Sequence, residues 1–323
     1  MRPTAEEDLR DLGKVAPRRI PIRVVTSFVL LAAGATAAGA QVPVRIAGGG
    51  GTPIAVYEAG NPAGPPIVFI HGFLGTHLTW ARQLGGPLAA EYRLVAYDLR
   101  GHGASGKPLE PESYTGSTAW AEDLAAVIRA KGLVRPVLVG WSYGGYVIAD
   151  YLRAHGADSL GGVVFVAAVS RAGSSEALAD LGGEAQALFQ GLLSEDVATA
   201  VSSTRDFISL LAARPLDPET REVILAGGMM VPAAVRLAMF SRQLDNDAVL
   251  AALRVPTLVV HGRADRIVLQ RAAEHIAATV PGATLLLYEG VGHAVALEDP
   301  GRFNRDLAAF VRGLRRPGPG GNR

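Results

Sequence analysis

The chain has 323 residues, of which 49% are hydrophobic, and its 31 Lys and Arg residues nearly balance 30 Asp and Glu residues. This balance excludes the strongly basic surface of a nucleic-acid-binding protein, so no nucleic-acid partner is expected. The absence of cysteine excludes disulfides, thiolate metal sites and a cysteine nucleophile. The length allows one large α/β domain with an insertion.

The N-terminal segment has the form of an export signal. Arg18, Arg19 and Arg23 precede an uncharged apolar run from Val24 to Ala40, which ends in the small residues Ala38-Gly39-Ala40. Basic residues, an apolar run and a small-x-small ending are typical of a cleaved signal peptide, and the run is short for a membrane-spanning helix. We expect residues 1–40 to be a signal peptide that exports the protein or, alternatively, a membrane anchor. Membrane contact is expected only through residues 20–40, if they are retained.

The next part of the chain alternates short strands with helices. Residues 42–57 alternate loosely around Gly48–Gly51, which predicts a hairpin. Helical patterning, as in Ser117–Ala130, separates the later strands, so a mostly parallel sheet is expected. Six runs of β-branched and aromatic residues are apolar on both faces, as in strands covered by helices on each side: Ile67–Ile70, Leu94–Tyr97, Val137–Val139, Val163–Val166, Leu258–Val260 and Leu285–Tyr288.

One long segment interrupts this alternation. Residues 171–253 contain no strand pattern and are rich in Ala and Leu, with helical patterning over 177–193 and 232–244. We interpret the segment as a helical cap inserted into the sheet domain, whose two parts are then residues 41–170 and 254–312. From Arg312 onward the chain is rich in Arg, Gly and Pro, and residues 313–323 are expected to be a disordered tail.

The strongest chemical signal is Gly140-Trp141-Ser142-Tyr143-Gly144, a G-x-S-x-G pattern. It directly follows the predicted strand at Val137–Val139 and precedes a predicted helix at Gly145–His155. A serine on such a strand-to-helix turn has its hydroxyl exposed above the sheet, and the helix N-terminus favours developing negative charge. The pattern predicts that Ser142 is a nucleophile; the alternative is a serine that only caps the helix.

A serine nucleophile needs a base. His293 follows the last predicted strand, at the sheet edge where α/β folds place their ligands, and is the predicted base. The other histidines are given structural roles. His71 and His261 each precede a Gly and are expected to bond to backbone in turns, and His102 is expected to pack in a loop. Three others are expected to face solvent on helices or at helix ends: His77, His155 and His275.

Three further groups complete the predicted site. Asp265 follows the strand at Leu258–Val260, at the same sheet edge as His293, and is predicted to orient that histidine; the alternative is a helix cap for Ile267 onward. The backbone N–H groups of Tyr143 and of Phe73, in the loop after the first core strand, are the predicted oxyanion donors. Trp80, Trp141 and the apolar cap favour an apolar substrate.

Five motifs together resemble the α/β-hydrolase superfamily, over about residues 44 to 312. They are Ile70-His71-Gly72-Phe73, Asp98-Leu99-Arg100-Gly101-His102-Gly103, Gly140-Trp141-Ser142-Tyr143-Gly144-Gly145, His261-Gly262-Arg263-Ala264-Asp265 and Gly292-His293. The sequence looks most like the branch that holds bacterial esterases, cofactor-free haloperoxidases and carbon–carbon bond hydrolases. Epoxide hydrolases and haloalkane dehalogenases carry Asp at the position of Ser142, which argues against both. In the family, the segment from Asp98 to Gly103 is a structural loop.

The resemblance implies an α/β-hydrolase fold and a serine hydrolase that cleaves a small, apolar carboxylic ester through an acyl-enzyme, with no cofactor or metal required. Perhydrolysis, acyl transfer and carbon–carbon bond hydrolysis use the same residues and stay open as alternatives. A receptor that binds a ligand on this fold without turnover is a second class, against which the intact Ser142, Asp265 and His293 argue. The sequence does not predict the oligomeric state.

Overall fold

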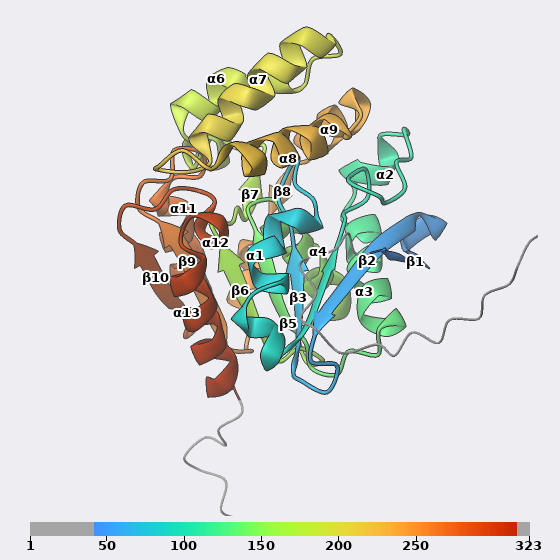
Figure 1. Cartoon of the computed structure of the whole chain (residues 1–323), viewed down its shortest axis with the longest axis vertical. Helices are drawn as coiled ribbons and strands as arrows, with labels where there is room; N and C mark the ends of the chain where they lie inside the picture. The colour runs from blue at the N-terminus through green and yellow to red at the C-terminus, as the bar shows by residue number, and fades with distance from the viewer. Residues whose placement is uncertain (1–41, 315–323) are drawn as a thin grey trace, which may run out of the picture. The chain divides into compact units, whose positions relative to one another are not determined.

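The computed structural model describes residues 42–314; the expected signal or anchor at residues 1–40 lies outside them, as do residues 315–323. Eight strands form one sheet in the order β1-β2-β4-β3-β5-β6-β9-β10 (Figure 1). Their bounds are β1 Val44–Ala47, β2 Pro53–Gly60, β3 Pro66–Ile70, β4 Arg93–Tyr97, β5 Val137–Trp141, β6 Gly162–Val166, β9 Thr257–Gly262 and β10 Thr284–Tyr288.

The sheet is mostly parallel, as the sequence predicted. All pairs from β4 through β10 are parallel, whereas β1 and β2 pair with each other, and β2 with β4, in the antiparallel sense. Every residue of β5 and β6 is buried, which explains why these strands are apolar on both faces. The expected hairpin is present as β1 and β2, and its turn contains Gly50 and Gly51 at φ +63° and +78°, in the left-handed region that favours glycine.

Helices cover both faces of the sheet. On one face α3 packs against α4, and α10 packs against both α4 and α11; on the other face α13 contacts both α1 and α12. The bounds are α1 Ala81–Leu84, α3 Thr118–Ala130, α4 Gly144–His155, α10 Asp247–Ala251, α11 Gln270–Thr279, α12 Val295–Glu298 and α13 Pro300–Gly313, with a short α2 at Glu112–Thr115 and 3-10 turns η1 Gly49–Gly51, η2 His77–Trp80 and η3 Pro87–Ala90.

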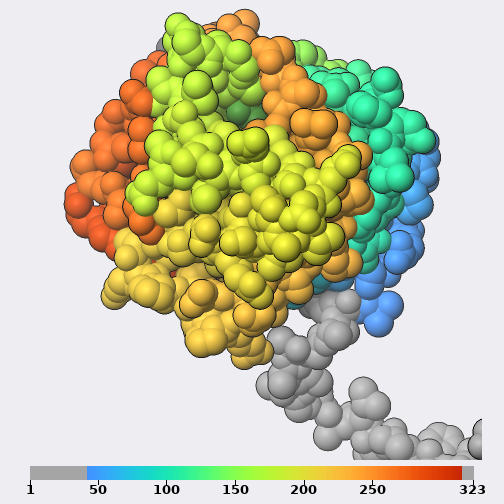
Figure 2. All heavy atoms as spheres, turned by 90° about the horizontal axis from the view of Figure 1, so that it is seen from above, coloured from blue at the N-terminus to red at the C-terminus, as the bar shows by residue number. Residues whose placement is uncertain are grey.

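Residues 171–253, the cap, lie between β6 and β9 in the chain. The helices α6 to α9 stand together above the sheet in Figure 1, and cap residues cover much of the face seen in Figure 2. The cap helices besides α10 are α5 Ser175–Ala179, α6 Gly183–Leu192, α7 Val197–Leu210, α8 Pro218–Met229 and α9 Ala233–Phe240. The expectation that the segment holds no strand was wrong. β7 (Arg171–Ala172) pairs antiparallel with β8 (Leu244–Asp245), two strands too short to show an alternating pattern.

The expectation of disorder from residue 313 was also wrong at its first residues. Helix α13 continues through Gly313, and Leu314 packs against the core. Phe303, Leu307 and Val311 bury one face of this helix, and Leu314 extends the same i, i+3/i+4 series. The composition of the tail hid this series, because Arg and Gly occupy the positions that face away from the core.

Candidate active site

Ser142 lies on a sharp turn between β5 and α4. Its φ is +55°, a left-handed conformation that is uncommon for a residue with a side chain. The Ser142 N–H donates to the carbonyl of Val166 at 3.0 Å, and the Ser142 carbonyl accepts the N–H of Gly145 at 2.9 Å. These bonds hold the serine in its strained conformation, which is the local geometry that the G-x-S-x-G pattern predicts.

The glycines around Ser142 are required by close backbone contacts. A Cβ on Gly140 would lie 2.7 Å from the carbonyl oxygen of Gly144, and a Cβ on Gly144 would lie 2.7 Å from that of Ile70. A Cβ on Gly145 would lie 2.5 Å from the carbonyl oxygen of Val169. The helix therefore starts within van der Waals contact of the strands, and only glycine fits at this junction.

His293 and Asp265 are joined by a buried hydrogen bond. The Nδ1 of His293 lies 2.8 Å from Oδ2 of Asp265, and the two residues expose only 1% and 6% of their surfaces. The other carboxylate oxygen, Oδ1, accepts the N–H groups of Ile267 and Val268 at 2.8 and 2.9 Å. Asp265 therefore bonds to His293, and its role in orienting that histidine stays a prediction. It does not cap helix α11 (Gln270–Thr279), whose N-cap is Leu269.

A second imidazole lies beside the same carboxylate. His261 Nε2 is 3.3 Å from Asp265 Oδ2 and donates to the carbonyl of Val268 at 2.9 Å. Burial lowers the pKa of His261. The sequence interpretation foresaw its bond to backbone but missed its contact with Asp265, for which the four-residue spacing on one strand end was the available signal.

Ser142, Phe73 and Tyr143 line one cavity of about 320 Å³. A Cβ on Gly72 would lie 2.9 Å from the Cβ of Ser142, so the loop that carries Phe73 packs directly against the serine turn. Within residues 42–314, the backbone N–H groups of Phe73 and Tyr143 donate to no protein acceptor. The hydroxyl of Ser142 forms no hydrogen bond with His293 in this structure.

The cavity is mainly apolar and strongly aromatic. The ring of Phe240, from α9, packs edge-on against Phe73 at 4.7 Å and against Phe189 at 4.9 Å between centroids. Tyr143, Tyr146, Phe207, Met239, Ile267 and Val268 also line it. Cap and sheet domain therefore contribute jointly to the walls.

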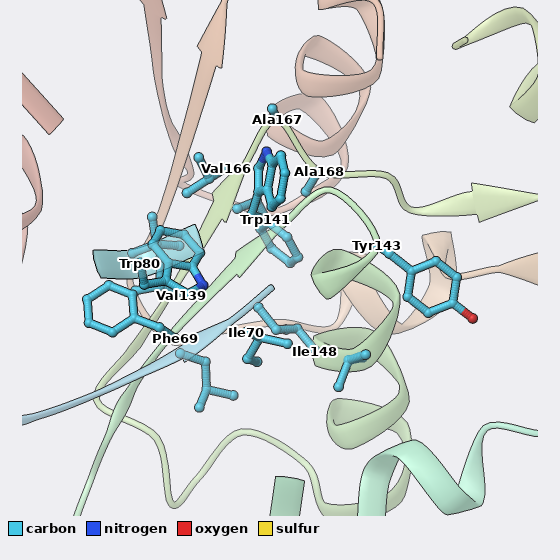
Figure 3. Close-up of a cluster of buried hydrophobic side chains, with 14 of the residues drawn as sticks. Phe69, Ile70, Trp80, Val139, Trp141, Tyr143, Ile148, Val166, Ala167 and Ala168 are labelled. Carbon is cyan, nitrogen blue, oxygen red and sulfur yellow. The ribbon is translucent and has the colours of Figure 1, made fainter. Parts of the chain in front are cut away.

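The two tryptophans expected at the substrate do not line this cavity. Trp80 is fully buried and packs on Phe69 at 4.9 Å between ring centroids. Trp141 points into the core next to Val166 and Ala168, away from the ring of Tyr143 (Figure 3). Trp141 is the last residue of β5 and exposes 6% of its surface, whereas Ser142, in the turn that follows, lines the cavity.

A buried ion pair fastens the cap behind the serine turn. Arg242, which follows α9, donates to Oδ2 of Asp150 on α4 at 2.7 Å, and both side chains are 0% exposed. The same guanidinium donates to the hydroxyl of Tyr143 and to Ser117 at 3.3 Å. Sequence reasoning missed this network, because no local pattern links an arginine to a carboxylate so distant in the chain.

The remaining histidines are partnered. His71 is buried and bonds through Nδ1 to a backbone carbonyl, as expected. His102, expected to pack in a loop, is buried and also bonds through Nδ1 to a backbone carbonyl. His77, expected in solvent, instead stacks on Tyr57 at 3.4 Å and places Nδ1 2.9 Å from Oδ1 of Asp98, in the structural loop. The expectation of solvated side chains also omitted two contacts: His155 with Glu122 at 3.1 Å and His275 with Asp247 at 2.7 Å.

Residues 42–314 contain no group of three His, Asp or Glu side chains that could hold a metal ion. No single helix in this part is long and apolar enough to cross a membrane, and α8 with α9 passes that test only as a pair bent by 87°.

Comparison with known proteins decides the family. Residues 65–300 match the model of the alpha/beta hydrolase fold family. The chain belongs to the α/β-hydrolase fold family. A crystal structure of the esterase RhEst1 from Rhodococcus sp. ECU1013 is 34% identical, with a TM-score of 0.80 over 85% of this chain and 100% of that one.

Two sequence relatives are named for different activities. The non-heme chloroperoxidase CPO-A1 of Kitasatospora aureofaciens is 30% identical over 77% of this chain and 92% of its own length. The bifunctional esterase/perhydrolase DCH of Acinetobacter calcoaceticus is 28% identical over 79% and 95%. This α/β hydrolase therefore has esterase and haloperoxidase relatives and is an enzyme of the hydrolase kind.

Proposed function

We propose that this α/β hydrolase cleaves carboxylic esters of small apolar molecules, with Ser142 as nucleophile, His293 as base and Asp265 as the group that orients His293. The observation that carries the proposal is the buried 2.8 Å bond between His293 and Asp265, combined with a strained serine at the apolar cavity. Such strain is found at functional sites, where surrounding structure maintains it.

The reaction proceeds in two steps. The Oγ of Ser142 attacks the ester carbonyl carbon while Nε2 of His293 takes its proton, and the tetrahedral intermediate collapses as His293 returns the proton to the leaving alcohol. Water then attacks the acyl-enzyme, His293 accepts a proton from it, and the carboxylic acid leaves as the proton passes to Ser142. The N–H groups of Phe73 and Tyr143, which have no acceptor in the part of the chain that the structure describes, are the proposed donors to the oxyanion in both steps.

Asp265 defines which nitrogen of His293 reacts. Because Oδ2 of a carboxylate only accepts, the hydrogen of His293 lies on Nδ1, and Nε2 is left with the lone pair that a base needs. The carboxylate also stabilises the imidazolium that forms in each step. The turn bonds to Oδ1 keep the Asp265 side chain in place.

Covalent labelling tests the proposal. A fluorophosphonate probe should label the wild-type protein at Ser142, and a panel of p-nitrophenyl esters of rising chain length should be hydrolysed. Ser142→Ala should abolish labelling and lower kcat on the order of a millionfold, as in the best-studied serine hydrolase. A wild-type protein that is neither labelled nor active would favour the receptor alternative, and turnover by Ser142→Ala would exclude this serine.

Perhydrolysis is the second candidate, and the chloroperoxidase and esterase/perhydrolase relatives favour it. Hydrogen peroxide would replace water in the second step, attack the acyl-enzyme and release a peracid. Peracid formation from an acetate ester and hydrogen peroxide, measured beside acetate formation, separates the two activities. A peracid yield no higher than the uncatalysed yield would leave ester hydrolysis alone.

We also propose that residues 1–40 export the protein and are then removed. The small-x-small ending before Gln41 supports this proposal. Mass spectrometry of protein from the natural host should give an N-terminus near Gln41. An intact N-terminus would favour the membrane anchor.

A further inference from the structure

The loop that carries His293 is bonded on both sides of the histidine. On one side, the N–H of Gly292 donates to Oε2 of Glu298 at 3.2 Å. On the other side, the N–H of Ala294 donates to the carbonyl of Leu211 at 2.6 Å. Leu211 belongs to the cap, at the end of α7. The backbone on either side of His293 therefore depends on partners that are not part of its own loop.

Glu298 joins this loop to the cap through a single atom. Its Oε2 also accepts the N–H of Ala213, in the segment between α7 and α8, at 2.8 Å. The other oxygen, Oε1, is buried and has no hydrogen-bond partner among residues 42–314. Two backbone N–H groups, one from the histidine loop and one from the cap, are thus the hydrogen-bond donors to this carboxylate, and such charge-assisted bonds are stronger than neutral ones.

The two backbones also touch. A Cβ on Gly292 would lie 2.7 Å from the N of Ala213 and 2.9 Å from the Cα of Ala212. A side chain at position 292 would push the histidine loop away from the cap. The absence of a side chain at Gly292 and the carboxylate of Glu298 therefore both keep the loop of His293 in contact with cap residues 211–213.

We propose that Glu298 is a positioning residue for His293, and that the cap segment 211–213 acts with it to hold the base at the nucleophile. The proposal rests on the proposed role of His293 as base. The cap then supports the geometry of the reaction in addition to lining the cavity. Misplacement of a catalytic group by about 1 Å costs on the order of a hundredfold in rate, so the effect is measurable.

Two substitutions at Glu298 distinguish its role as a hydrogen-bond acceptor from the effect of its negative charge. Glu298→Gln keeps an oxygen acceptor for both N–H groups, and its kcat should stay within about threefold of wild type. Glu298→Leu removes the acceptor and should lower kcat about ten- to a hundredfold, with KM within about twofold because Glu298 does not line the cavity. The rate of fluorophosphonate labelling should fall by the same factor, because labelling needs His293 to activate Ser142.

Asp299 provides the matched control. It is the next residue and also carboxylic, but its side chain accepts the N–H of Arg302 at the start of α13. Asp299→Ala should lower the midpoint of urea unfolding and leave kcat of the folded protein unchanged. If Glu298→Leu does not fold, Gly292→Ala tests the same support from the opposite side, and its kcat should fall at least tenfold as the added Cβ displaces the loop.

A readout independent of turnover separates this proposal from the proposed function. The downfield proton resonance of His293 Nδ1–H, assigned by its loss in Asp265→Asn, should shift or broaden in Glu298→Leu and remain in Glu298→Gln. Wild-type kcat and an unchanged resonance in Glu298→Leu would overturn the positioning role, as would a Gln variant as impaired as Leu. An altered resonance in a protein that hydrolyses no ester would overturn the function and leave the positioning role standing.

Discussion

The indole Nε1 of Trp141 donates a hydrogen bond of 2.9 Å to the backbone carbonyl of His293. The two rings also pack at 5.3 Å between centroids. The residue directly before the proposed nucleophile therefore holds the backbone of the proposed base, although the two are far apart in sequence. This bond explains why a large polar-edged ring occupies a position that the motif leaves unspecified.

Trp141→Phe should test this link. Phenylalanine keeps a ring in the core but leaves the His293 carbonyl without its donor, and an unsatisfied buried acceptor costs about 1 to 3 kcal/mol. The free energy of unfolding in urea should fall by that amount, and kcat should fall severalfold with KM nearly constant. A loss of stability with unchanged kcat would show that the bond matters only for folding.

Asp265→Asn should lower kcat on the order of ten-thousandfold. The amide keeps an acceptor for the N–H groups of Ile267 and Val268, so the turn should survive, but its NH₂ group would face Nδ1 of His293 and favour the wrong tautomer. Asp247→Asn is the control, because that carboxylate bonds to His275 on α11. The activity is measured as the rate of p-nitrophenyl acetate hydrolysis. If Asp265→Asn keeps more than about a tenth of the wild-type kcat, another acid must orient His293.

Phe240→Ala should change substrate choice. The ring separates Phe73 from Phe189 in the cavity wall, so its removal enlarges the cavity and should shift the optimum of kcat/KM toward longer or bulkier acyl groups. Met230→Ala is the control, since Met230 is 53% exposed and does not line the cavity. Leu193→Ala is a second control, because this half-buried cap residue does not line the cavity either. Small-phosphonate labelling should persist in Phe240→Ala. An unchanged ester profile would show that the ring only packs the cap.

Arg242→Met should destabilise the fold strongly. It removes the buried cation that lies 2.7 Å from Oδ2 of Asp150 and leaves this fully buried carboxylate only the more exposed Arg153, 3.4 Å from Oδ1. Breaking a buried pair costs about 3 to 5 kcal/mol. The double variant Arg242→Met/Asp150→Leu removes both charges and should recover most of that loss, measured as the free energy of unfolding in urea at neutral pH. Equal stability of the single and double variants would mean that the loss of the ion pair does not cause the destabilisation of Arg242→Met.

Two buried histidines should make the fold sensitive to acid. Burial lowers the pKa of His71 to about 4 and that of His102 to about 3, whereas an unfolded histidine titrates near about 6.5. The neutral form is needed in the fold: Nε2 of His71 accepts the N–H of Leu99. Since the unfolded chain binds more protons below about pH 6.5, stability is full above that pH and falls as the pH drops toward about 4.

His102→Asn provides the measurement. Its amide nitrogen lies where Nδ1 lies, so the donor to the Arg100 carbonyl is kept while the titrating ring is lost. Urea unfolding between about pH 7 and pH 4.5 should give a shallower loss of stability for this variant than for wild type, by up to about 1.4 kcal/mol per pH unit for one proton. Identical slopes would show that His102 does not titrate on unfolding.

The sequence was most informative where local patterns decide the structure. A strand, a glycine-flanked serine and a helix are neighbours in the chain, so the turn at Ser142 could be predicted from spacing. The approach of His293 to Asp265 followed from a general rule, since the carboxyl ends of parallel strands meet at one sheet edge. These roles remain proposals, although the geometry of both groups was anticipated.

What could not be predicted are contacts between segments that are distant in the sequence. Arg242 and Asp150, or Glu298 and Ala213, lie in segments whose separation in sequence carries no periodic signal. Trp141 was misassigned for a related reason: a large apolar residue beside a serine motif can face the core or the cavity, and its bond to the distant His293 carbonyl has no local signal in the sequence. His77 contacts Asp98 because β3 and β4, the strands that precede these two residues, pair side by side in the sheet.

Some of the residues that line the cavity, on and beside α5, are exposed to solvent. Leu178, on α5, lines it and exposes 51% of its surface, and exposed Gly173 and Ser174 lie beside it. The cap is fixed elsewhere, by Arg242 behind the serine and by residues 211–213 at the histidine loop. The exposed part of the cavity lining at α5 is therefore separate from both attachments of the cap, and a substrate that enters there would leave these attachments intact.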